Sequence, residues 1–177
     1  MRRTTIPSID NRPGWESIDQ PLWDSATMPV PASEVDSTRI ALFRIPIGGS
    51  DVGGIMKTTA DTNMVLSSQL PRHNEYLIDR ITLLVPEGDE EDRMRFYWEG
   101  ELMLAIGQKR YLTLPFMSLF GKSYENDRLP LLVPESMVFG VDVMFGRAPR
   151  IKRPLRFIVE LGGILFRRYK LTLGVST

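Results

Sequence analysis

The chain of 177 residues contains no cysteine and a single histidine, His73. The lack of cysteine excludes disulfides, thiolate metal sites and a cysteine nucleophile, and it fits a reducing compartment. One histidine excludes metal centres built from several imidazoles and most catalytic triads. His73 could act as a single base beside Glu75, but its polar surroundings (residues 71–75) favour a surface loop.

Motifs for small-molecule chemistry are also missing. Gly121-Lys122-Ser123 resembles the end of a phosphate-binding loop, but Phe116 stands where that loop requires a glycine. The carboxylates show no spacing typical of a glycosidase, and the glycine-rich segment 48–54 lacks the oxygen ligands of a calcium loop. We therefore expect no catalytic residue, no cofactor, no metal and no small-molecule substrate.

Long apolar runs are absent as well. No segment approaches the ~18 apolar residues that a membrane-spanning helix needs, and the polar, proline-containing N-terminal region does not resemble a signal peptide. We expect a soluble protein that is made in the cytoplasm.

The charges are balanced overall but unevenly distributed. Twenty-two basic and 22 acidic residues give no net charge, which argues against a general nucleic-acid binder. Residues 147–177, however, hold one acid, Glu160, and eight basic residues, so they carry a net +7 while residues 1–146 carry −7. We treat the basic residues as a candidate face for genome, membrane or subunit contact, with an ordinary solvated surface as the alternative. They are Arg147, Arg150, Lys152, Arg153, Arg156, Arg167, Arg168 and Lys170.

Residues 1–38 differ in composition from the remainder of the chain. They contain five prolines and scattered apolar residues, among them Trp15 and Trp23, without helical or strand periodicity. We predict an extended arm that lies against its own domain or a neighbouring subunit, followed by a β domain over 39–177.

The β domain is predicted from short runs of β-forming residues separated by turn signals. Gly162-Gly163 predicts a two-residue hairpin connection, the acidic residues 87–92 predict a solvated loop, and residues 115–121 allow one short helical turn. This pattern predicts an all-β antiparallel sandwich or barrel. The predicted strands are 39–47, 76–85, 94–98, 101–106, 111–114, 136–145, 155–161 and 164–175.

Three segments carry a resemblance to a known family. Residues 61–81 contain Thr-Asn-Met, then Gln-Leu-Pro, then a strand; residues 107–116 and 153–161 add a glycine-led strand and a proline-led strand. Over residues 39–175 this resembles the single jelly-roll coat proteins of small tailless icosahedral bacteriophages. The resemblance implies an eight-stranded jelly roll of two four-stranded sheets.

In such a family the chain would be a virion capsid subunit, made in host cytoplasm. It would self-assemble as trimers, pentamers or a closed shell beside other virion proteins. The arm would tie neighbouring subunits together, although it lacks the dense basic run of arms that hold genome. The basic C-terminal region could contact nucleic acid or an inner membrane.

Two other classes of protein remain open. A β-sandwich could be a binding module, such as a phage decoration, spike or tail protein or a carbohydrate-binding domain. Aromatic side chains exposed on one sheet face would favour carbohydrate binding, whereas burial of the aromatics between the sheets would favour a shell. A cupin-like enzyme is disfavoured by the single histidine.

Overall fold

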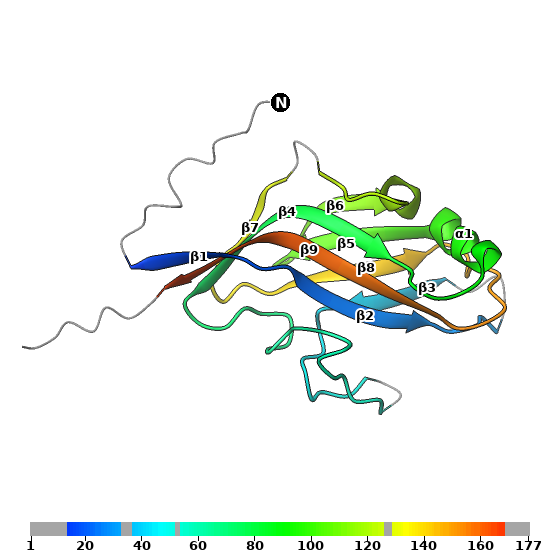
Figure 1. The fold of residues 1–177 in the computed structure, drawn as a ribbon, viewed down its shortest axis with the longest axis horizontal. Coiled ribbons are helices and arrows are strands. Elements are labelled where there is room, and N and C mark those ends of the chain that lie inside the picture. Colours follow the sequence, from blue (N-terminus) through cyan, green and yellow to red (C-terminus); the bar gives the residue numbers. More distant parts are fainter. Residues whose placement is uncertain (1–13, 33–36, 52–53, 126–128, 169–177) are drawn as a thin grey trace, which may run out of the picture.

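The computed structural model describes residues 14–32, 37–51, 54–125 and 129–168, which form two antiparallel sheets packed as a sandwich (Figure 1). The prediction of an antiparallel β-sandwich is confirmed in that the fold is mostly β with two antiparallel sheets, although it also contains an α-helix. One sheet contains β1 (Trp15–Asp19), β2 (Leu22–Met28), β4 (Asn74–Leu84), β7 (Leu131–Val133) and β9 (Leu155–Arg168). The other contains β3 (Thr38–Leu42), β5 (Gly100–Ile106), β6 (Lys109–Pro115) and β8 (Phe139–Phe145).

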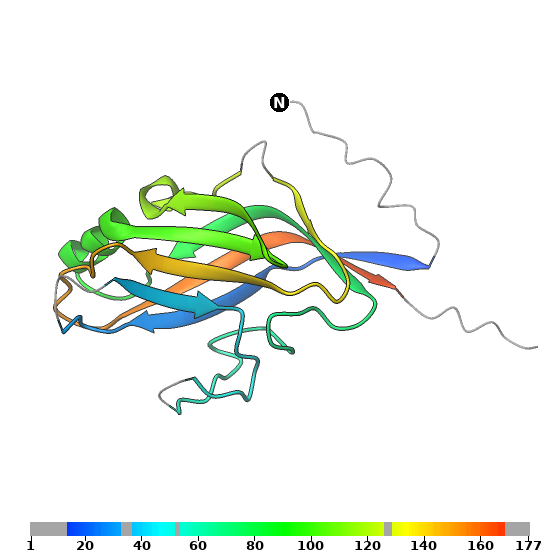
Figure 2. The same cartoon turned by 180° about the vertical axis from the view of Figure 1, so that it is seen from behind.

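The strand pairs are nested along the chain. β2 pairs with β9, β3 with β8, β4 with β7 and β5 with β6, all antiparallel. β9 also pairs with β4, and β8 with β5, so the strand orders are β2-β9-β4-β7 and β3-β8-β5-β6. Figure 2 shows the second sheet in front of the first. Consecutive strands therefore mostly alternate between the two sheets.

The core lies between the sheets and is closed at one end by α1 (Glu90–Glu99) and the short 3₁₀ helix η2 (Phe116–Leu119). Phe96 of α1 is fully buried, with ring centroids 5.1 Å from Phe116, 5.3 Å from Phe145 and 5.2 Å from Phe157. Aromatic pairs at these separations add to the gain from burial. They join both sheets, the helix and the 3₁₀ turn into one cluster, and η2 confirms the helical turn predicted over 115–121.

Helix α1 corrects two predictions. Residues 94–98 were expected to be a strand and residues 87–92 a loop, but Glu90–Glu99 is helical. The Asp89 carboxylate accepts a hydrogen bond from the Asp92 N–H at 2.8 Å and so caps the helix. The acids of the first turn lie at the positive end of the helix dipole. The helix buries Phe96 and Tyr97 on its inner side. These two residues are adjacent in the sequence, and the alternating pattern of a strand does not predict that both are buried.

The predicted hairpin at Gly162-Gly163 is wrong, because β9 runs continuously through both glycines. Both neighbouring strands are irregular there. β4 has a register shift between Ile78 and Arg80, and β1 and β2 are separate strands that flank residues 20–21 on the other side of β9. The glycines therefore lie where the sheet is irregular rather than where the chain turns back. Residues 169–175 of the strand that was predicted over 164–175 lie outside the described residues.

Part of the predicted arm is a component of the sheet. β1 and β2 fall within residues 1–38 and pair with opposite ends of β9. The Tyr76 hydroxyl lies 2.9 Å from the Gln20 carbonyl oxygen and 2.6 Å from the Leu161 carbonyl oxygen, which ties the β1–β2 junction to the centre of the sheet. Residues 1–13 and 33–36 of the arm lie outside the described residues.

We predict that Gly163→Ala lowers the free energy of unfolding by about 2 kcal/mol or more. A Cβ at this position would lie 1.9 Å from the Leu77 carbonyl oxygen, so the β4–β9 ladder would have to shift. Gly146→Ala is the control, because a Cβ there meets nothing within 4 Å, and we expect a change within ~0.5 kcal/mol. Urea unfolding followed by tryptophan fluorescence measures both; equal midpoints would contradict the prediction.

Candidate interaction surfaces

The outer edge of β2 is covered by a return of the β3–β4 connection. The Ser25 N–H donates to the Asp61 carbonyl at 2.8 Å, the Asn63 N–H donates to the Trp23 carbonyl at 3.2 Å, and the Trp23 N–H donates to Asn63 Oδ1 at 2.9 Å. These bonds satisfy backbone groups that an edge strand would otherwise present to another chain. Pairing of this edge with a second copy is thereby blocked.

A buried ion pair fixes this connection to the sheet. Asp24 of β2 is fully buried and contacts the ammonium of Lys57, which also donates to the Ser25 carbonyl at 2.6 Å. Asp24 further accepts hydrogen bonds from the N–H groups of Ser25, at 3.0 Å, and Phe43, at 2.5 Å. Burial raises the pKa of the Asp24 carboxyl, while Lys57 and the Phe43 N–H act in the opposite direction. Asp24 thus holds both the start of the connection and Lys57 against β2.

The part of the connection that ends at Lys57 projects from the sandwich as a short hairpin (Figures 1 and 2). We call this hairpin the finger and describe its residues 47–51 and 54–57. Its two sides are joined by the Gly48 N–H to the Lys57 carbonyl and the Lys57 N–H to the Gly49 carbonyl, both at 2.8 Å. Ile55 and Met56 are 70% and 61% exposed. Val65 and Leu66, later in the same connection, are 66% and 44% exposed.

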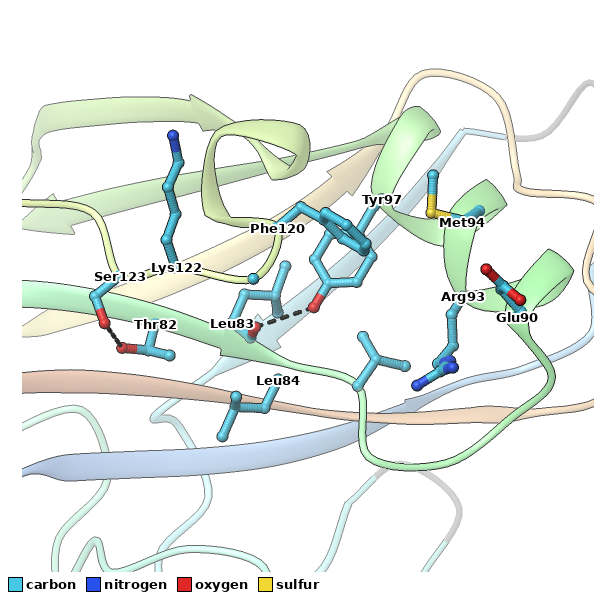
Figure 3. Close-up of a pocket in the computed structure, with 12 residues that line it drawn as sticks. Thr82, Leu83, Leu84, Glu90, Arg93, Met94, Tyr97, Phe120, Lys122 and Ser123 are labelled. Atoms are coloured by element: carbon cyan, nitrogen blue, oxygen red, sulfur yellow. Dashed lines mark hydrogen bonds between the residues drawn. The ribbon is translucent and has the colours of Figure 1, made fainter.

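A groove of about 510 Å³ lies at the opposite edge of the same sheet (Figure 3). Tyr97 forms one wall: its hydroxyl donates to the Leu83 carbonyl at 3.0 Å, and its ring meets Phe120 edge-on with 4.9 Å between centroids. Phe120 and Leu84 remain 46% and 45% exposed. The groove is lined by residues 82–85 at the end of β4, by Glu90, Arg93, Met94 and Tyr97 of α1, and by residues 120–123.

The structure separates the basic residues of the predicted C-terminal face. Arg147, Arg150, Lys152 and Arg153 lie in the β8–β9 connection, and Arg156 lies near the start of β9. Arg167 and Arg168 end β9, more than about 30 Å away at the usual rise of a strand. Lys170 lies outside the described residues. The described basic residues therefore form two groups near opposite ends of the sandwich.

Two residues of the group near α1 are partly neutralised. The Lys152 ammonium is 2.6 Å from a Glu91 carboxylate oxygen, and Arg156 is 3.3 Å from Asp61. Lys152 and Arg95 both lower the pKa of Glu91, which remains ionised at neutral pH. Arg156 and Asp61 link the start of β9 to the covering segment of β2. Part of the basic charge therefore holds the domain together.

The other sequence candidates do not converge. His73 Nδ1 lies 3.5 Å from Glu135, and Gly121, Lys122 and Ser123 line the groove. Within the described ranges, no three histidine or acidic side chains gather as a metal site would require. Among these residues, too, no helix has the length and apolar character to cross a bilayer.

Sequence reasoning missed a polar cluster on the outer face of the second sheet. Asp142 of β8 is buried, with Arg39 2.6 Å from Oδ2 and Arg44 3.5 Å from Oδ1. Oδ1 accepts no hydrogen bond from the described residues, and a cavity of about 180 Å³ adjoins it. The alternation of β8 places Asp142 outward, but only the structure shows that the arginines cover it.

Comparison with protein-family models, curated proteins and solved structures finds no match to this chain.

We predict that Lys57→Met lowers the free energy of unfolding by about 3 kcal/mol at pH 7, because it leaves the Asp24 carboxylate buried without its cation. The folded-state pKa of Asp24 is raised above its unfolded value, so the cost of holding the charge is absent below the unfolded-state pKa and is complete once the pH has risen through the folded-state pKa. Without Lys57 this cost grows, and the destabilisation relative to wild type should shrink between pH 7 and pH 4. Urea unfolding at both pH values measures it. Lys109→Met, at an exposed position, is the control; an equal loss at both pH values would contradict the assignment.

Proposed function

We propose that this chain is a virus coat subunit, an eight-stranded jelly roll that assembles with copies of itself into an icosahedral shell. The nested pairing of β2 with β9, β3 with β8, β4 with β7 and β5 with β6 carries the proposal. A single long antiparallel hairpin that is rolled up produces this order, and viral capsid domains are among the proteins built this way. In this interpretation β1 is an N-terminal extension that continues β2 along β9.

The placement of the aromatic residues supports a shell over carbohydrate binding. Seven large aromatic side chains are fully buried: Phe43, Tyr76, Phe96, Phe116, Phe139, Phe145 and Phe157. The exposed ones, Trp98, Tyr111 and Phe120, lie on α1, on β6 and after η2. No sheet face of the described residues therefore carries the row of aromatics that stacking on a sugar would use.

In this proposal the exposed apolar side chains of the finger, Ile55 and Met56, and of the groove, Leu84 and Phe120, contact other proteins. The two basic groups offer further contacts, to a neighbouring subunit, genome or an inner membrane. In this proposal the chain resides in the virion beside other virion proteins, and it uses no cofactor and no catalytic group. The groove favours the second candidate, a phage decoration, spike or tail module that binds another protein.

The assembly state of the purified full-length chain tests the proposal. We expect trimers, pentamers or closed particles in size-exclusion chromatography with light scattering and in negative-stain microscopy. Their abundance should change between low and high salt because the charge is unevenly distributed. A strict monomer in every condition would contradict the coat assignment and favour the binding module. Removal of residues 1–13 tests the arm without deleting β1 and β2; removal of residues 1–38 would delete both strands.

A further inference from the structure

We propose that the cavity beside Asp142, on the outer face of the second sheet, binds a carboxamide group. The cavity has a volume of about 180 Å³, and its lining includes Arg44, Ser68, Ala105, Gly140 and Asp142. In the complex the amide N–H donates to Asp142 Oδ1, and the amide oxygen accepts from the Arg44 guanidinium. Such binding goes beyond the coat assignment and is independent of whether copies of the chain assemble.

Asp142 is a buried polar group whose hydrogen bonding the fold leaves incomplete. It is 4% exposed, and its Oδ2 accepts a hydrogen bond from Arg39 at 2.6 Å. Oδ1 is buried as well but accepts no hydrogen bond from the described residues. A buried carboxylate oxygen without a donor is costly, so a ligand that supplies one N–H restores a hydrogen bond that the fold lacks.

Arg44 provides both access to Oδ1 and the second half of the site. Its guanidinium lies 3.5 Å from Asp142 Oδ1, which is an ion-pair distance without a hydrogen bond. The side chain is 53% exposed, so a rotation toward solvent opens Oδ1 while the guanidinium stays beside the cavity. An acceptor and a set of donors then lie next to each other at the wall of the cavity.

The charges around Oδ1 determine which donor fits. Arg39 and Arg44 already place two positive charges beside one carboxylate, so an ammonium or a metal ion would add a third cation and is disfavoured. An anion would place its lone pairs against Oδ1, which accepts hydrogen bonds but does not donate them. The fitting ligand is therefore neutral and carries an N–H donor beside an oxygen acceptor, which describes a carboxamide.

Small residues create the space for this group. Gly140 lies two residues before Asp142 on β8, so both face the same side of the sheet, and Ala105 of β5 is paired with Gly140. A Cβ at Gly140 would meet nothing closer than the Leu42 carbonyl oxygen, at 3.6 Å. The volume exceeds the ~30 Å³ share of one water in the liquid, and Ala105 and Val138 give the carbon part of a ligand apolar contacts.

An NMR titration of the ¹⁵N-labelled full-length chain with acetamide tests the inference. We expect saturable shifts at the backbone N–H groups of residues 105, 107 and 138–140, with a millimolar Kd, as suits so small a ligand. Acetate, methylammonium and ethanol at the same concentration and ionic strength should each bind at least tenfold more weakly. N-methylacetamide represents a peptide group and acetamide a primary amide, so the tighter of the two identifies the source of the carboxamide.

Two variants locate the binding in this cavity. Gly140→Ala fills the space without a close contact, and Arg44→Leu removes the donor to the amide oxygen. We expect each to weaken acetamide binding at least tenfold, whereas Gly146→Ala and Arg153→Leu, matched changes at exposed positions, bind as wild type does. Thermal unfolding checks that every variant is folded.

Three results would overturn the inference. The first is a wild-type chain that shows no saturable shift with either amide. The second is equal binding of acetate, methylammonium or ethanol, which would assign the cavity to ions, water or any small solute. The third is wild-type affinity for acetamide in a folded Gly140→Ala or Arg44→Leu variant, which would place the binding elsewhere.

Discussion

The buried contact between Asp24 and Lys57 is the interaction on which much of the molecule's outer form depends. A carboxylate with no exposure to water is tolerable only because an ammonium and two backbone N–H groups surround it. Its partners come from β2, from the end of β3 and from the β3–β4 connection. This ion pair therefore fixes the base of the finger. It also holds the connection in the place where it crosses and covers the edge of β2.

The irregular centre of the first sheet depends on a second constraint, the close approach of β9 to its neighbours at Gly162-Gly163. Side chains at these positions would meet the Arg80 guanidinium and the Leu77 carbonyl. Because the glycines have none, β4 can shift its register, and β1 and β2 can pair with one continuous strand on its other side. A strand of 14 residues can in this way belong to the sandwich at one end and extend to β1 at the other.

The sequence predicted the class of fold because alternation and turn residues are local signals. The strands at 76–85, 101–106 and 111–114 and the turn at 115–121 were found where the structure has them. The errors arose where contacts between residues far apart in the sequence determine the local structure. Residues 94–98 are rich in β-forming aromatics, but the Asp89 cap and burial of Phe96 make them helical. Gly162-Gly163 meets the local rules of a hairpin, and only the neighbouring strands show otherwise. The finger, the groove and the Asp24–Lys57 pair join residues far apart in the sequence, which no local pattern reveals.

The covering of the β2 edge bears on how copies of this chain could associate. An open edge invites pairing with any exposed strand, which gives poorly defined and unlimited association. Here Asp61 and Asn63 occupy that edge, and Tyr124 bonds to Ile81 on the outer edge of β4. The exposed apolar side chains are instead those of the finger and of the groove, none of which offers a free backbone edge. Contacts made by side chains, unlike open strand pairing, can fix the angle between two neighbouring copies, and a fixed angle is what a closed ring or shell requires.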